Sequence, residues 1–295
     1  MAVSVTLASF NTLLLRKFKN RTFTTPGDSF FFNGGLSLMW TLIMLIWFFA
    51  SGDRAISTGA MIYGAVFGCI LCGFLFLKNE SLASGPVSLT SLIGNCAFII
   101  ATLFGVFWAH NPINGFQIVG MLLIVVALLL CINPKKSTET LSAKWFVCCF
   151  FFFLVGGFVG MFNIVFGKSP VKSEINGMML TASVVSCILF FLMGIAVNKA
   201  KKQPMPTIRK GALPYILLSG ISGCTYFRLN TALTPIIPSP IFFPVSNGGI
   251  VIISTFVGAL LFKEKLSKVQ FWGIIVGLVA IVITGCGQTL WNLFF

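Results

Sequence analysis

Long runs of apolar residues alternate with short polar connections along nearly the whole chain. A helix that spans a bilayer needs about 20 mostly apolar residues. Nine runs meet this length: 27–50, 59–77, 85–108, 113–133, 145–167, 174–197, 212–232, 238–261 and 267–287. Residues 1–15 are apolar but shorter, and we interpret them as a tenth helix that is short or cropped at its N-terminus. The pattern therefore predicts an all-α integral membrane protein with about ten transmembrane helices.

The order of small and polar positions repeats between the two halves of the chain. Segment 84–108 parallels 238–262, and segment 116–130 parallels 269–283. The matched positions are Pro86 with Pro240, Gly94 with Gly248, Gln117 with Gln270, and Gly120 with Gly273. Each half holds five helices, an odd number, so the halves must cross the membrane in opposite directions, as in the inverted repeats of many secondary transporters. We predict a first repeat over 1–133, a basic linker loop over 134–144, a second repeat over 145–287 and a C-terminal tail over 288–295.

Composition supports a bilayer as the solvent. The chain is 57% hydrophobic and 9% charged, whereas a soluble domain carries about 25% charged residues. High hydrophobicity also excludes a disordered chain. A net charge of +14 would by itself suggest nucleic acid, but the basic residues stand in short clusters between apolar runs, so we expect no nucleic-acid partner. Nine cysteines lie within the apolar runs and are expected to serve packing rather than disulfides.

The end of the second half resembles a known family. The stretch LFKEKLSKVQFWGIIVGLVAIVIT at 261–284 is similar to the closing turn and helix of the drug/metabolite transporter superfamily, EamA-like branch. Two departures are Lys263 at the usual turn glycine and the first-half counterpart AHNPIN at 109–114, which has no acid. The resemblance implies ten helices in two inverted repeats, a transporter rather than an enzyme, and a central cavity formed by the third, fourth, eighth and ninth helices.

Basic residues mark one side of the predicted membrane domain. Sixteen of the 20 Lys and Arg residues follow helices 1, 3, 5, 7 and 9, and three follow the other helices. The positive-inside rule makes the richer side cytoplasmic and leaves both termini outside, whereas the resemblance implies cytoplasmic termini. We favour the charge rule. Labelling cysteines placed at Lys201 and Gly52 with an impermeant reagent distinguishes the two orientations.

Buried polar residues are the candidates for substrate binding. Arg228 leads them, because charge inside a membrane is costly and usually functional, although a long basic side chain also snorkels to the interface. The other candidates are Tyr226, Asn230, Ser246, Asn247, Asn95, Thr102, Asn163 and Asn11. Amides in hydrocarbon need a partner, and bonds between helices explain such residues at least as often as ligands do.

A second group of residues is predicted to serve gating or ion coupling. Glu174 and Asp28 stand near helix starts, where carboxylates also act as caps. Lys78 lies near the point of the first repeat that corresponds to Arg228, so the two could flank one cavity. Pro86, Pro240 and Pro244 would loosen helix hydrogen bonding. His110 and Glu264 are expected to be interfacial, Glu264 paired with Lys263 or Lys265.

These features predict a secondary transporter that moves a small metabolite or amphipathic compound by alternating access. The spans hold no Asp or Glu at their centres, which favours a neutral or anionic solute over a cation. A channel or a non-transporting accessory subunit is the alternative, and a membrane-embedded enzyme is less favoured because no catalytic or metal-binding constellation is present. We expect no cofactor and no metal, and as partners a small-molecule substrate, the lipid bilayer, a possible coupling ion and, at most, a second copy in a homodimer. The expected location is a bacterial plasma membrane.

Overall fold

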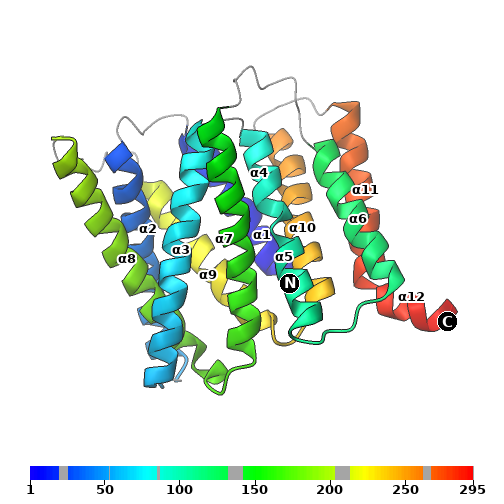
Figure 1. Cartoon of the computed structure of the whole chain (residues 1–295), viewed down its shortest axis with the longest axis horizontal. Helices are drawn as coiled ribbons and strands as arrows, with labels where there is room; N and C mark the ends of the chain where they lie inside the picture. Colours follow the sequence, from blue (N-terminus) through cyan, green and yellow to red (C-terminus); the bar gives the residue numbers. More distant parts are fainter. Residues whose placement is uncertain are drawn as a thin grey trace. The chain divides into compact units, whose positions relative to one another are not determined.

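The computed structural model describes residues 1–19, 26–52, 54–84, 87–131, 142–202, 213–261 and 267–294. Pro86, the turn with Lys263, Glu264 and Lys265, and most of the predicted linker loop lie outside these residues. The described helices (Figure 1) are, in order, α1 (Ala2–Lys19), α2 (Pro26–Ala50), α3 (Thr58–Ser84), α4 (Val87–Cys96), α5 (Phe98–Phe107), α6 (Gly115–Cys131), α7 (Ala143–Gly167), α8 (Ile175–Ala200), α9 (Leu213–Leu233), α10 (Ser239–Leu261), α11 (Lys268–Gly285) and α12 (Gly287–Phe294).

The helices coincide with the predicted apolar runs, so the all-α membrane fold is confirmed. Seven helical segments of the described chain are long and apolar enough to cross a bilayer: Gly27–Ala50, Thr58–Ser81, Leu89–Phe107, Ala143–Gly167, Lys172–Ala200, Ser239–Leu261 and Lys268–Gly285. Ala2–Leu14 and Gly115–Cys131 are shorter apolar helices. Although α9 is 21 residues long, it falls outside both sets, since Arg228, Asn230 and several small residues lower its hydropathy.

The described part of the run predicted at 85–108 forms two helical segments joined by a single tighter turn, in which Ala97 keeps right-handed helical dihedral angles. The turn lies between α4 and α5, where the Ala97 backbone N–H donates to the Gly94 carbonyl at 3.3 Å, one residue closer than in an α-helix. The matched helix α10 continues through Pro244 without a break. The tighter turn thus lies in one of the two matched runs, and at an alanine rather than at a proline.

Packing divides the chain into two compact units. Unit 1 contains Met1–Ser9, Leu77–Val165 and Leu233–Phe295, and unit 2 contains Phe10–Phe76 and Phe166–Ala232. Each unit takes segments from both halves of the sequence, because helices pack across the halves as well as within them. The boundaries of the two repeats, which follow sequence rather than packing, stay a prediction.

In unit 1 the matched helices α6 and α11 pack side by side in opposite directions. A methyl group added at Gly273 would meet the Cys131 backbone nitrogen at 3.0 Å, and one at Gly277 would meet the Ala127 Cβ at 3.2 Å. Positions therefore rise along α6 as they fall along α11. Close approach of this kind needs residues without bulk, which explains small residues at matched positions.

The matched glutamines have one shared role, at the starts of these two helices. Gln117 Oε1 accepts from the Asn114 backbone N–H at 3.1 Å, and Asn114 Oδ1 accepts in return from the Gln117 N–H at 2.9 Å. Ser267 and Gln270 form the same reciprocal pair before α11. Both are capping boxes. The glutamine match between the halves thus reflects helix capping.

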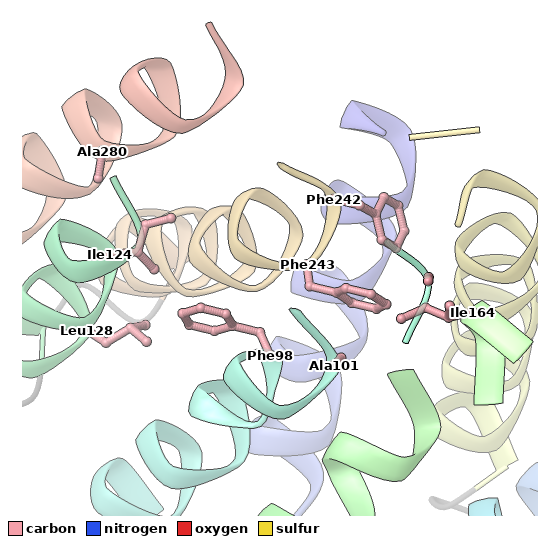
Figure 2. Packing of buried hydrophobic residues seen from close by; sticks show 9 residues of the cluster. Phe98, Ala101, Ile124, Leu128, Ile164, Phe242, Phe243 and Ala280 are labelled. Atoms are coloured by element: carbon pink, nitrogen blue, oxygen red, sulfur yellow. The ribbon is translucent and has the colours of Figure 1, made fainter. Parts of the chain in front are cut away.

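The core of unit 1 lies where α5, α6, α7, α10 and α11 meet. Figure 2 shows its buried side chains, which are Phe98, Ala101, Ile124, Leu128, Ile164, Phe242, Phe243 and Ala280. Rings from α5 and α10 fill the space between aliphatic residues of α6 and α7. This packing buries the apolar faces that the helices turn away from lipid.

In unit 2, α2 and α8, the second helices of the two predicted repeats, are also antiparallel. The Ser186 hydroxyl donates to Ser37 Oγ at 3.2 Å, and methyl groups at Gly34 and Gly194 would meet the rings of Phe191 and Phe31. Helix α3 packs on α8 through the small pair Gly64 and Gly68, whose methyl groups would lie 2.6 and 2.7 Å from the carbonyl oxygens of Met178 and Ala182. Antiparallel contact between corresponding helices in both units is what an inverted repeat requires.

Candidate functional site

Arg228 lies in unit 2, near the C-terminal ends of α9 and α2 and the N-terminal end of α8. Its Nε donates to Asn176 Oδ1 at 2.9 Å, and its guanidinium carbon lies 4.4 Å from the centre of the Trp47 ring. The Asn176 amide nitrogen donates onward to Ser51 Oγ at 3.0 Å. The guanidinium is therefore held by an amide at one edge and by an aromatic ring on one face.

The neighbouring candidates on α9 pair with each other. Asn230 Nδ2 donates to the Tyr226 hydroxyl at 3.3 Å, one helical turn away. Phe227 follows Tyr226 in sequence and packs on Trp40 with ring centres 5.1 Å apart. Tyr226 and Asn230 thus form a local pair that stabilises α9.

Asn11 joins α1 to α9. Its amide nitrogen donates to the Ser219 carbonyl at 2.8 Å and to Ser222 Oγ at 3.2 Å. The absence of a side chain at Gly223 lets Asn11 and Trp40 approach α9 closely. Asn11 accordingly makes the hydrogen bonds between helices that the sequence offered as the alternative to ligand contact.

The two carboxylates near helix starts have different partners. Glu174 Oε2 accepts from the Ser57 backbone N–H at 2.6 Å, directly before α3. It makes no side-chain cap at its own helix, α8. Asp28 stands in the first turn of α2, where a carboxylate favours the positive end of the helix dipole. Glu174 therefore caps α3, a helix far from it in sequence.

In unit 1 two candidate amides turn back on their own helices. Asn95 Nδ2 donates to the Ser91 carbonyl at 2.6 Å, and Asn247 Nδ2 donates to the Phe243 carbonyl at 2.9 Å. Asn163, on α7, is buried with 1% of its surface exposed. Asn95 and Asn247 thus each use one amide N–H within their own helix.

Two hydroxyl candidates of unit 1 are buried without a hydrogen-bond partner among the described residues. They are Thr102 on α5 and Ser246 on α10, each 1% exposed. Pro240 and Pro244, one helical turn apart on α10, are both buried. Lys78 on α3 is half-buried. Lys78 and Arg228 belong to different units, so their flanking of one cavity stays a prediction.

Three residues around Arg228 were not among the sequence candidates: Trp47, Asn176 and Ser51. Trp47 stands in the apolar run IWFF, a position that suggests contact with lipid. Asn176 follows Glu174 at a predicted helix start, a position that suggests a helix cap. The signal available in the sequence is weak, since it consists of one tryptophan and one amide near the ends of predicted neighbouring helices.

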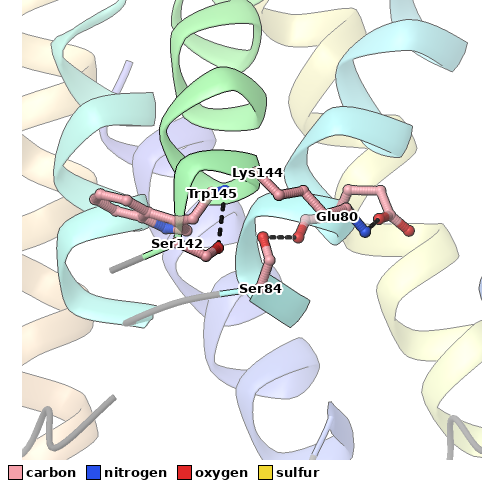
Figure 3. A network of polar contacts seen from close by, with 5 residues as sticks. All are labelled: Glu80, Ser84, Ser142, Lys144 and Trp145. Atoms are coloured by element: carbon pink, nitrogen blue, oxygen red, sulfur yellow. Dashed lines mark hydrogen bonds and ion pairs between the residues drawn. The ribbon is translucent and has the colours of Figure 1, made fainter. Parts of the chain in front are cut away.

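A second polar network joins the two halves within unit 1 (Figure 3). Lys144 Nζ forms an ion pair with Glu80 Oε2 at 2.8 Å, although the lysine side chain is 66% exposed. Beside it, the Trp145 indole N–H donates to the buried Thr90 hydroxyl at 2.9 Å. This network fixes the start of α7 against α3 and α4. Within the described chain, no three His, Cys, Asp or Glu side chains gather as metal ligands.

Comparison with known proteins adds the family. Residues 1–133 match the EamA-like transporter family. A solved structure titled "Crystal structure of protein" is 11% identical over 95% of this chain and 94% of its own, with a TM-score of 0.75, and this likeness shows the fold alone. No curated protein matches. The family match covers the first of the two predicted repeats and confirms, for that part of the chain, the resemblance to the EamA-like transporters of the drug/metabolite transporter superfamily.

Proposed function

We propose that this multi-pass membrane protein is a secondary transporter that moves a small metabolite or amphipathic compound by alternating access. The observation that carries the proposal is the antiparallel pairing of corresponding helices, α2 with α8 and α6 with α11. In transporters built from two inverted repeats, one repeat rocks against the other, so that the binding site opens first to one side of the membrane and then to the other.

A neutral or anionic solute fits the distribution of charge. The carboxylates of the described chain, Asp28, Glu80 and Glu174, lie near helix ends and none is fully buried, so none of them lies at a helix centre where it could neutralise a cation. Arg228 supplies a positive charge instead, and no carboxylate of the described chain pairs with it. An anion would gain from this charge, and a cation would be repelled by it.

The test begins with purified protein screened for thermal stabilisation by a metabolite library. Solutes that stabilise the protein are then followed into proteoliposomes. Arg228→Ala and Asn247→Ala are expected to lower the uptake rate while expression is retained, and Arg54→Ala, an exposed arginine of the same unit, serves as the matched control. Full transport by both variants would mean that the candidate site is misplaced.

A further inference from the structure

The guanidinium of Arg228 has one occupied edge and one face covered by a ring. Its Nε is used by Asn176 and its face by Trp47. No described residue hydrogen-bonds to the two Nη groups or forms an ion pair with them. The outer edge, with its parallel N–H donors, is therefore unused by this part of the protein.

The neighbours hold that edge in a fixed orientation. Asn176 is 3% exposed, and its nitrogen is bonded to Ser51, so that its oxygen must face Arg228. Trp47 restricts rotation of the guanidinium plane through a cation–π contact. A fixed arginine loses less conformational entropy when it binds a ligand than a free one does.

Among the described residues of unit 2, neither carboxylate forms an ion pair with Arg228. Glu174 Oε2 accepts from the Ser57 backbone at the start of α3, and Asp28 stands at the opposite end of α2. A snorkelling arginine would need neither the amide nor the ring. The arrangement resembles a prepared binding edge rather than a side chain that only escapes the hydrocarbon.

We propose that the Nη edge of Arg228 is a site for an oxyanion, a carboxylate or a phosphate. Two parallel N–H donors match the two oxygens of either group in a bidentate pair. The oxyanion belongs to the transported solute or to a lipid headgroup. The first case deepens the transport function and rests on it, whereas the second does not depend on it.

Two substitutions test the site. Arg228→Gln removes the charge and the paired donors. Asn176→Asp keeps the size of the side chain but places a carboxylate against the guanidinium, where it competes with any external anion. Arg54→Gln is the matched control, because Arg54 also lies over a ring, that of Phe49, but is exposed.

Binding is measured in two arms with the full chain in nanodiscs. In the first arm, phosphatidylcholine discs are titrated with inorganic phosphate or sodium acetate at constant ionic strength, and thermal stabilisation gives the affinity. In the second, discs containing phosphatidylglycerol are analysed by native mass spectrometry for retained anionic lipid. We expect both test variants to weaken binding about tenfold or more in one arm, since charge-assisted hydrogen bonds are lost, while Arg54→Gln binds as the parent does.

The arm that responds identifies the source of the oxyanion. Unchanged binding in both arms for Arg228→Gln, or an equal loss for Arg54→Gln, would overturn the proposal, as would the absence of anion binding by the parent protein. Anion binding that depends on Arg228, without any solute flux, would leave the oxyanion site standing and refute the transport function instead.

Discussion

Replacement of Gly64 by alanine is expected to push α3 away from α8. The added methyl group would lie 2.6 Å from the Met178 carbonyl oxygen and 2.6 Å from the Thr181 Cβ, where ordinary contact begins at 3.4 Å. Neither atom can swing aside, because both are fixed to the backbone of α8. The helices must therefore separate by roughly 0.8 Å at this point, a strain of the kind that overpacked cores show.

The free energy of unfolding should fall by about 1 kcal/mol. Overpacking costs about 1–3 kcal/mol, and alanine returns up to about 1 kcal/mol through its higher helix propensity. Gly59→Ala, in the same helix, is the control, because its methyl group would meet only side-chain atoms, Val171 Cγ1 at 3.2 Å and Ser57 Oγ at 3.6 Å. Reversible unfolding in mixed micelles measures the difference. A Gly64→Ala variant as stable as Gly59→Ala would refute the close approach of α3 to α8.

Four further substitutions test the polar contacts of unit 1. Gln117→Ala and Gln270→Ala each remove half of a capping box and should lower unfolding free energy by similar amounts, about 1 kcal/mol, measured in the same micelles; a large difference between them would argue against their shared role. Lys144→Ala breaks an exposed ion pair with Glu80 and should cost only about 0.5 kcal/mol, a loss that disappears in high salt. Trp145→Phe removes the indole donor to a buried threonine hydroxyl and should cost about 1 kcal/mol, seen as a lower midpoint of thermal unfolding.

Sequence periodicity was sufficient for the fold because hydrophobic length is a direct requirement of the bilayer. Each apolar run coincides with helical structure, and the internal repeat is matched by antiparallel helix pairs. The position of the tighter turn between α4 and α5 could not be predicted in this way. Prolines were predicted to loosen both matched runs, at Pro86, Pro240 and Pro244, yet α10 continues through Pro244 and the tighter turn falls at Ala97.

The candidate site was less predictable than the fold. Buried polarity correctly marked Arg228 as unusual, but its partners come from α2 and α8, about 180 and 50 residues away along the chain. Contacts between helices depend on rotation about each helix axis, and an all-round apolar sequence does not encode this strongly. Glu174 stands directly before α8, as predicted, but the same limit explains why its hydrogen bond to the Ser57 backbone at the start of α3 could not be predicted.

Counterflow in proteoliposomes tests the central claim most directly. Vesicles are loaded with an excess of the unlabelled solute found in the stability screen, and uptake of a labelled trace is followed. Alternating access predicts a transient accumulation of label above equilibrium, because each carrier returns loaded, and the accumulation should be lost in Arg228→Ala. Uptake that only approaches equilibrium, at a rate independent of internal solute, would contradict alternating access and indicate a channel.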